Sequence, residues 1–188
     1  MFDRLTVSKA LAVAALLCGF GPVAGLAGEK AMPKGSVVLT IAGKTTDWNR
    51  GAMAPARDSL LKHHKISFER AMAFDWDTLA ALPQQELRVV TPAGDGSFSG
   101  PLLKDVLSAS GADKGTVRVV ALDGSTTDLT PQDLLSQDWM LTLAVDSRPV
   151  GIGDFGPLWL MHKPASGTTP SQAEIERWVW SVFYIEVL

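Results

Sequence analysis

The order of short strand-like and helix-like segments is the feature that most constrains the fold of this chain. Residues of high β-propensity gather in short runs at 36–42, 66–73, 86–91, 116–122, 140–145, 159–161 and 178–187. Helix signals fall between them at 75–82, at 101–110, after Thr130 and after Ser171. The segments follow no regular βαβ rhythm, and no Gly-x-Gly-x-x-Gly motif follows a strand. The sequence therefore predicts an α+β domain of mixed β-sheets with short helices, and argues against a doubly wound nucleotide-binding fold.

Two regions carry more specific local expectations. In 101–110 leucine and valine have helical spacing, so we expect Pro101 at the first helical position and Gly111 just past the last. The least patterned region, 44–65, is expected to be a long loop, with or without one short helix. Its adjacent histidines at 63–64 would diverge on a helix and alternate on a strand, which makes them a poor chelating pair. We therefore predict no metal site.

The N-terminal segment has the features of an export signal. Two basic residues precede an apolar run over 10–20, and small residues follow at 25–27. The run is shorter than the roughly 20 residues that a membrane-spanning helix needs. We expect a cleaved signal peptide over 1–27 and a periplasmic domain over 28–188 that does not insert into the membrane. An uncleaved anchor is the alternative.

Cysteine and charge limit the chemistry of the expected mature chain. Cys18 is the only cysteine and lies in the expected signal, so no disulfide, thiolate ligand or cysteine nucleophile would remain. A lipid anchor at Cys18 is disfavoured because the bulky Leu17 precedes it. Without Arg4, Lys9 and Asp3, the 17 basic and 20 acidic residues become 15 and 19, a net charge of −4. This balance gives no electrostatic reason to bind nucleic acid or an anionic membrane.

Aromatic and charged residues gather around the stretch Gly153–Pro164. A glycine-rich turn there leads into a short strand that places Trp159 and Met161 on the same face. Arg148 lies just upstream, and Arg-Trp-Val-Trp follows at 177–180. Such residues can hold a flat polar heterocycle, because rings stack on it and charged groups bind its edges. The same residues could instead close a small hydrophobic core.

A set of ordered segments runs from about Leu39 to Leu188. Its members are Phe74–Pro83, Phe98–Leu107 with Gly111-Ala112, Val117–Gly124, Leu143–Asp146, Gly156–Leu158 and Ile185–Val187. In this order they resemble the molybdopterin-binding domain of the sulfite oxidase family. The resemblance covers most of the expected mature chain and rests on the order, since no single segment is specific. It implies the α+β fold of that domain.

The chain departs from catalytic members of this family at three places. Those members hold their metal through a cysteine between the third strand and the next helix, where this chain has Val-Val-Thr-Pro at 89–92. Neither valine nor threonine supplies the soft ligand that a thiolate offers. Ser125 stands where they have a tyrosine, and Trp159 where they have an arginine. The resemblance therefore implies no catalytic residues and no molybdenum cofactor.

A short exported branch of the family, without that cysteine, is more similar still. Its members are stand-alone periplasmic proteins with a Gly-Pro-x-Trp motif and a C-terminal Arg-x-x-Trp before Ile-Glu-Val. The corresponding residues here are Asp154, Gly156, Pro157, Trp159, Arg177 and Trp180. That branch binds reduced pterins and passes the signal to membrane-bound enzymes of cyclic-di-GMP metabolism. The resemblance implies a non-catalytic pterin-binding protein whose partner is the periplasmic part of a membrane-bound signalling protein.

A pterin is a flat bicycle with a guanine-like edge, and this chemistry suggests a role for each candidate. Trp159 would be the stacking platform, and the Asp154 carboxylate would accept hydrogen bonds from the pyrimidine edge. Arg177 or Arg148 would bind a carbonyl or side-chain oxygen. Phe155 and Trp180 would form the walls.

Two other functions fit the same residues. One is a molybdopterin-dependent oxidoreductase with an atypical metal ligand. The other is an interaction module without a ligand, whose pocket Trp159 and Trp180 fill themselves. Singly, Asp154 could be a turn residue and Arg177 a surface charge. Of Trp178 and Trp180, at least one is expected in the core.

Overall fold

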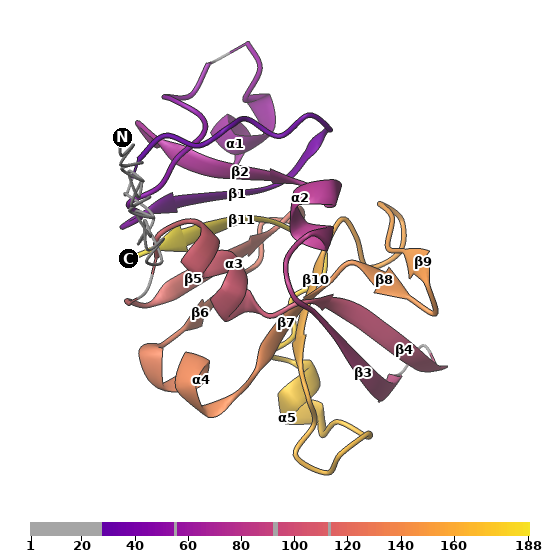
Figure 1. Ribbon diagram of the computed structural model, residues 1–188. Coiled ribbons are helices and arrows are strands. Elements are labelled where there is room, and N and C mark those ends of the chain that lie inside the picture. Colours follow the sequence, from indigo (N-terminus) through magenta and orange to yellow (C-terminus); the bar gives the residue numbers. More distant parts are fainter. Residues whose placement is uncertain (1–27, 55, 92–93, 113) are drawn as a thin grey trace, which may run out of the picture.

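The chain forms a mixed α+β structure, which a computed structural model describes for residues 28–54, 56–91, 94–112 and 114–188 (Figure 1). The α+β class with short helices is as the sequence pattern predicts, and within these residues there are three β-sheets and five short helices. The expected signal peptide, 1–27, lies outside the described residues. No described helix has the length and apolar character needed to cross a membrane.

The larger half of the molecule is built on a five-stranded sheet in the order β2-β1-β11-β5-β6. Its strands are β1 (Val37–Gly43), β2 (Ala71–Asp75), β5 (Val117–Ala121), β6 (Thr126–Leu129) and β11 (Val182–Val187). The pair β1·β11 is parallel and the other pairs are antiparallel. The C-terminal strand therefore lies at the centre of the sheet, which ties the aromatic segment before it to the core.

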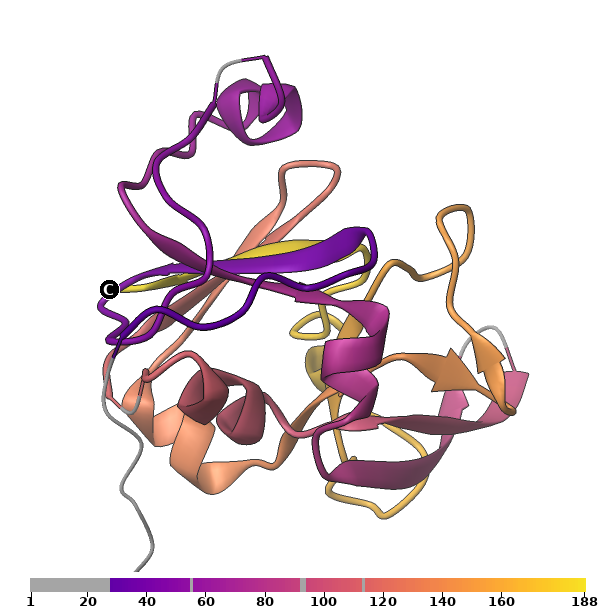
Figure 2. The ribbon, with the colours of Figure 1, turned by 45° about the horizontal axis from the view of Figure 1, so that its top comes forward.

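Both faces of this sheet are covered. Leu39 and Ile41 of β1 pack with α3 (Leu103–Ala109) in one cluster, whereas Ala42 packs with Leu61 of α1 (Ser59–His63) in another. Alternate side chains of a strand point to opposite faces, so α1 and α3 lie on opposite sides of the sheet. Figure 2 shows α1 on one side and α3 with α4 (Pro131–Ser136) on the other.

The smaller half contains the other two sheets. A four-stranded sheet has the order β3-β4-β8-β9, and a two-stranded sheet pairs β10 with β7. Their strands are β3 (Gln84–Thr91), β4 (Gly94–Pro101), β7 (Trp139–Thr142), β8 (Ala144–Val145), β9 (Arg148–Pro149) and β10 (Trp159–His162). A Cβ atom at Gly100 of β4 would overlap the carbonyl oxygen of Leu141 in β7. Glycine at this position allows the two strands to approach closely.

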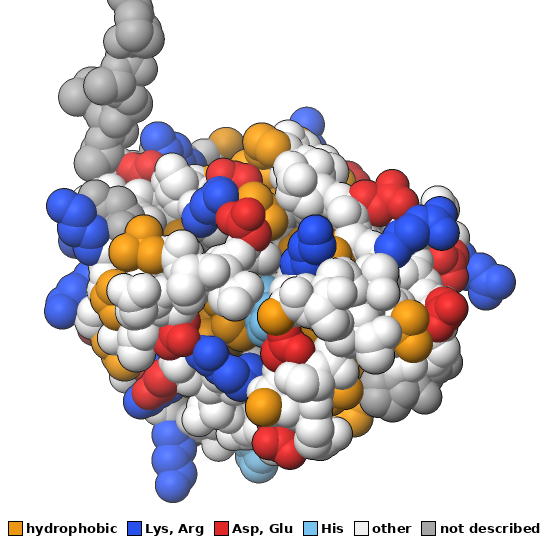
Figure 3. Space-filling model, turned by 90° about the horizontal axis from the view of Figure 1, so that it is seen from below, with side chains coloured by type: hydrophobic (Ala, Val, Ile, Leu, Met, Phe, Trp, Pro, Cys, Tyr) orange, Lys and Arg blue, Asp and Glu red, His pale blue; other side chains and the backbone are white. Residues whose placement is uncertain are grey.

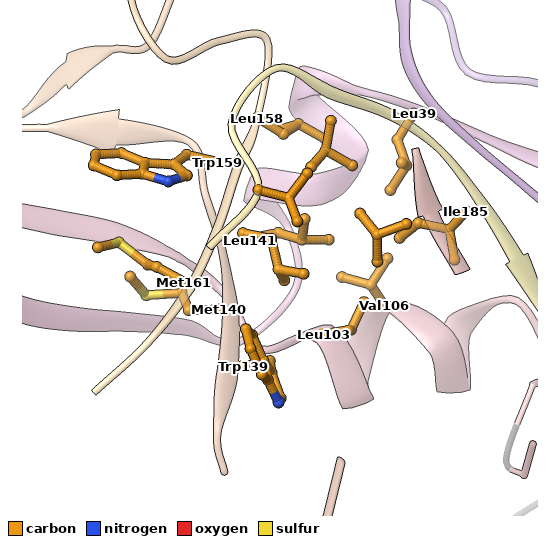
Figure 4. Packing of buried hydrophobic residues seen from close by; sticks show 14 of the residues in the cluster. Leu39, Leu103, Val106, Trp139, Met140, Leu141, Leu158, Trp159, Met161 and Ile185 are labelled. Atoms are coloured by element: carbon orange, nitrogen blue, oxygen red, sulfur yellow. The ribbon is translucent and has the colours of Figure 1, made fainter. Parts of the chain in front are cut away.

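One hydrophobic cluster joins the two halves. Figure 4 shows Leu39, Ile185 and Val106 at the end near the five-stranded sheet, and Leu141 in the middle. Trp159 lies at the opposite end of the cluster, within the smaller half. Its position makes Trp159 part of the core and also part of the surface that this end presents.

Three helices begin at the caps that the sequence predicts. The side chains of Asp75, Thr130 and Ser171 each accept a hydrogen bond from the N3 backbone N–H, and each N3 side chain accepts one from the backbone N–H of the cap residue. These reciprocal capping boxes start α2 (Trp76–Ala80), α4 and α5 (Gln172–Ile175). The loop predicted over 44–65 contains the one short helix α1.

Several predicted boundaries are wrong. Segment 66–70 is not a strand: β2 begins only at Ala71, and Phe68 instead stacks its ring against Tyr184 at 6.4 Å. Pro101 ends β4 instead of starting α3, although Gly111, with φ 68°, does follow that helix. β4 was not predicted because its Gly-Asp-Gly-Ser start has low β-propensity, which its full-length pairing with β3 overrides.

The C-terminal strand is also shorter than the predicted 178–187. β11 begins at Val182, because Ser181 adopts a left-handed φ of 54° that interrupts the extended chain. The residues before this break pair with β10 instead: Val179 and Leu160 exchange backbone hydrogen bonds of 2.7 and 2.9 Å. Trp178 and Trp180 are thereby held next to Trp159 and outside the main sheet.

The region 44–65 covers an edge of the large sheet. The Asn49 side chain donates to the Ala73 carbonyl at 2.8 Å and accepts from the Ala73 N–H at 2.7 Å. Arg50 pairs with Ala71 by two backbone hydrogen bonds of 3.0 and 3.1 Å. These contacts occupy the outer edge of β2 and protect it from pairing with another chain.

Candidate functional site

An aromatic pocket of about 590 Å³ opens beside β10. It is lined by Thr91, Phe155, Trp159, Ile175, Glu176, Trp178 and Trp180. They come from the end of β3, the loop before β10, the start of β10, the last residue of α5 and the segment that follows α5. Four of the seven are aromatic, and the volume is in the range of about 300 to 1,000 Å³ typical of small-molecule sites.

The rings are arranged as one stack with two edge contacts. Phe155 stacks on Trp159 with centroids 4.1 Å apart and an interplanar angle of 19°, and on Trp180 at 5.8 Å and 25°. Trp178 and Phe98 meet Trp159 edge to face, at 5.8 Å and 5.4 Å. One face of the Trp159 indole is therefore already covered by the Phe155 ring.

Backbone hydrogen bonds place these rings. Trp159 is opposite Thr142 in the β10·β7 pair, which fixes its position in the strand. The loop that carries Phe155 turns at Gly153, whose φ of 109° favours glycine. The Ser181 N–H donates to the Phe155 carbonyl at 2.8 Å and so joins this loop to the C-terminal segment.

The indoles differ in exposure. Trp159 is 6% exposed and Trp178 8%, whereas Trp180 is 54% exposed. The prediction that at least one of Trp178 and Trp180 lies in the core is confirmed by Trp178. Its Nε1 is buried and has no hydrogen-bond acceptor among the described residues. A ligand acceptor that reached this N–H would remove a cost of about 1 to 3 kcal/mol.

Glu176 and Thr91 supply the polar side chains of the lining. Glu176 directly follows α5 and is exposed, and its Oε1 accepts from Gln172 Nε2 at 3.1 Å. The Thr91 hydroxyl donates to the Gly94 carbonyl at 3.0 Å. Figure 3 shows that charged side chains of both signs are spread over the face seen from below, with hydrophobic side chains in a hollow at its centre.

Arg177 does not line the pocket. Its Nη2 donates to Asp133 Oδ1 at 2.7 Å, and its guanidinium lies 5.4 Å from the Trp139 ring centroid. Hydrogen bonds from the Thr130 hydroxyl and then from Arg177 lower the pKa of Asp133 to about 2. Asp133 is therefore ionised at neutral pH. Its ion pair holds the Arg177 side chain on the side of the segment after α5 that faces away from the pocket.

The other two polar candidates also lie outside the lining. Asp154 is exposed in the loop before β10, where its backbone N–H donates to the Gly151 carbonyl at 3.1 Å. Arg148 is exposed in β9 at the edge of the four-stranded sheet. Of the six predicted site residues, the pocket brings together Trp159, Phe155 and Trp180.

The sequence contains a signal for only one of the lining residues that were not predicted, Trp178. Glu176, Trp178 and Trp180 are two apart, and all three line the pocket, whereas Arg177 and Val179 do not. Side chains alternate in direction along an extended segment, which favours Trp178 and Trp180 on one face. Glu176 and Arg177 instead lie in a turn after α5, where the Arg177 N–H donates to the Glu174 carbonyl at 3.1 Å and the Trp178 N–H to the Ile175 carbonyl at 3.0 Å. Alternation therefore does not indicate which of Glu176 and Arg177 enters the pocket. Thr91 and Ile175 carry no comparable signal, because tertiary packing alone brings them to the pocket.

The end of β3 is where the resemblance would place a metal-binding cysteine. Val89 is buried, Val90 is 38% exposed, and Thr91 lines the pocket. Alkyl groups and a hydroxyl do not supply a soft ligand, so these residues do not fit a molybdenum centre held through sulfur. Within the described ranges, no three histidine, aspartate or glutamate side chains gather where they could hold a metal ion.

Comparison of the chain with models of known protein families and with curated proteins finds no match.

Proposed function

We propose that this protein binds a pterin-type heterocycle without catalysing a reaction on it. We also propose that it is a periplasmic protein, exported by a cleaved signal, that reports the ligand to a membrane-bound enzyme of cyclic-di-GMP metabolism. The fold proposed with this function is that of the sulfite oxidase molybdopterin-binding domain. The mixed α+β architecture of the described residues, with its short helices, supports this proposal only at the level of fold class.

The aromatic pocket is the observation that carries the proposal. It combines four rings with few polar side chains, which suits a flat heterocycle that is bound mainly through its ring faces. Stacking of one base on an aromatic side chain contributes about 1 to 3 kcal/mol, and a pterin ring resembles guanine in size and edge chemistry. Micromolar binding corresponds to about −8 kcal/mol, which two such stacking contacts do not reach. Hydrogen bonds to the edge of the ligand must therefore add to them.

Glu176 and Trp178 can supply those hydrogen bonds. The carboxylate of Glu176 can accept two hydrogen bonds from the amino group and ring N–H of a pterin, in place of the predicted Asp154. The buried Trp178 N–H, which lacks an acceptor among the described residues, can donate to a ring nitrogen or carbonyl. The proposed site therefore consists of Trp159, Trp178, Trp180 and Glu176, with Phe155 as a movable ring.

The proposed partner contact involves exposed apolar residues beside the pocket. Ile152 is 82% exposed and forms a backbone bridge with Phe155, which itself stacks on Trp180. A ligand that displaced Phe155 would change the shape of this surface. The residues that contact the ligand and those open to a partner are thus adjacent.

The test is calorimetric and fluorescence titration of the protein with a 7,8-dihydropterin. We expect tryptophan quenching with a dissociation constant in the micromolar range, and a loss of about tenfold or more in affinity for Trp180→Ala. Because truncating a buried tryptophan costs about 3 to 5 kcal/mol of stability, Trp159→Phe is preferred to Trp159→Ala at that position. Trp76→Phe, an exposed indole outside the pocket, is the matched control. Unchanged affinity in both pocket variants would refute the site.

A second function, an interaction module without a ligand, is favoured by one observation. Phe155 already stacks on both Trp159 and Trp180, so the rings pack against one another without a ligand between them. In that case the exposed faces of Trp180 and Ile152 would contact a partner protein directly. Failure of every pterin to bind, together with pull-down of a partner that Trp180→Ala abolishes, would favour this function over the first.

A further inference from the structure

We infer that Glu176 makes the aromatic pocket selective for ligand charge. It would admit heterocycles whose edges carry N–H donors or positive charge, and would discriminate against ligands with a phosphate or another anionic tail. The inference rests on the proposed function and adds to it the class of pterin that the site accepts.

The first support is the charge of the lining. Glu176 is the single ionisable side chain among the seven that line the pocket. The other polar side chains there are the Thr91 hydroxyl and the indole N–H groups, which carry no charge. The faces of tryptophan rings are electron-rich and attract cations, and an anion gains nothing from them.

The second support is the position of the nearest arginine in the sequence. Arg177 follows Glu176 directly, but it points away from the pocket to Asp133, 44 residues earlier, at 2.7 Å. The guanidinium also lies over Trp139 at 5.4 Å. The cation next to the site is thus already paired with a carboxylate, and is not positioned to neutralise a ligand phosphate.

The third support is the bonding capacity of a carboxylate. An ionised carboxylate accepts hydrogen bonds and donates none. Glu176 therefore matches an amino-pyrimidine edge, which presents two donors side by side. A phosphate presents only acceptors and negative charge. Two unit charges a few ångströms apart near a protein surface repel by enough to weaken binding about tenfold or more at low salt, and the effect falls as salt is added.

The experiment compares two probes that share one ring, 6-hydroxymethyl-7,8-dihydropterin and its diphosphate ester. Both are titrated calorimetrically into wild-type protein, Glu176→Gln and Glu69→Gln at low and at high ionic strength. Glu69 is an exposed carboxylate before β2 that does not line the pocket, so its substitution makes the same chemical change elsewhere. Thermal unfolding of each variant checks that the fold is intact.

In the wild type and in Glu69→Gln we expect the ester to bind at least about tenfold more weakly than the alcohol at low salt, with a smaller difference at high salt. In Glu176→Gln we expect the difference to narrow to about threefold or less, and the alcohol to lose affinity. Equal or tighter binding of the ester to the wild type would overturn the charge selectivity and leave the pterin site standing. A difference that persists in Glu176→Gln would overturn the role of Glu176. Binding of neither probe would overturn the proposed function, and this inference with it.

Discussion

Single residues decide which faces of the aromatic pocket are available. Trp159 is nearly buried, and the ring of Phe155 covers it at 4.1 Å with almost parallel planes. A flat ligand that uses Trp159 as its platform must therefore displace Phe155 or stack on it. The loop that carries Phe155 has glycines at 151, 153 and 156, which gives its backbone freedom to move.

We predict that Phe155→Ala tightens binding of a 7,8-dihydropterin by a factor of about 2 to 10. The reason is that an aromatic pair contributes about 0.5 to 1.5 kcal/mol, which the ligand no longer has to replace. Calorimetric titration measures the change. Ile152→Ala in the same loop is the control and should leave the affinity unchanged. Weaker binding by Phe155→Ala would show instead that Phe155 is a wall of the site.

At the scale of elements, the ion pair between Asp133 and Arg177 joins the capped helix α4 to the segment that follows the capped helix α5. Thr130 caps α4, which carries Asp133, and Ser171 caps α5, which leads into Glu176. The two caps have the same reciprocal geometry, but only α5 and the segment after it contribute to the pocket lining, whereas α4 does not. The pair therefore offers a way to separate helix stability from ligand binding.

We predict that Thr130→Ala and Ser171→Ala each lower the free energy of unfolding by about 1 kcal/mol, the usual cost of losing a cap. Only Ser171→Ala should also weaken pterin binding, by several-fold, because the end of α5 holds Glu176 in place. Denaturant unfolding and ligand titration of both variants measure the two effects. Equal binding losses in the two variants would contradict the assignment of α5 to the site.

At the scale of the whole molecule, three carboxylates in capping boxes link stability to pH. Asp75, Asp133 and Glu174 have their pKa lowered to about 2. The largest causes are hydrogen bonds from the Thr78 hydroxyl, the Thr130 hydroxyl and the Ala165 backbone N–H, respectively. In the unfolded chain such groups titrate at about 4. Each carboxylate therefore holds its charge more strongly in the folded protein than in the unfolded chain, and its ionised form stabilises the fold.

We predict that the melting temperature is constant from pH 7 to about pH 5 and falls as the pH drops through 4 towards 2. The sign follows because a lowered folded pKa stabilises the protein above the unfolded pKa, and this stability is lost as the three groups take up protons. Circular dichroism melts across this range measure it. Asp75→Asn should be less stable at pH 7 and show a smaller drop in acid. A melting temperature that held steady down to pH 2.5 would contradict this account.

Local chemistry determined much of this structure. The caps at Asp75, Thr130 and Ser171, the stop at Gly111 and most strands follow from neighbouring residues, because capping and side-chain alternation act over a few positions. The choice of a mixed α+β architecture follows from their order. The aromatic half of the site, Trp159, Phe155 and Trp180, could also be named from the sequence.

Tertiary structure alone decided the polar half of the site. Arg177 is turned to an aspartate 44 residues away, and Thr91 comes to the pocket from the end of β3. The break at Ser181 moves the two C-terminal tryptophans out of the main sheet and against β10. Such outcomes depend on contacts between segments far apart in the chain, whose relative positions are set by packing of the whole core and not by any local pattern.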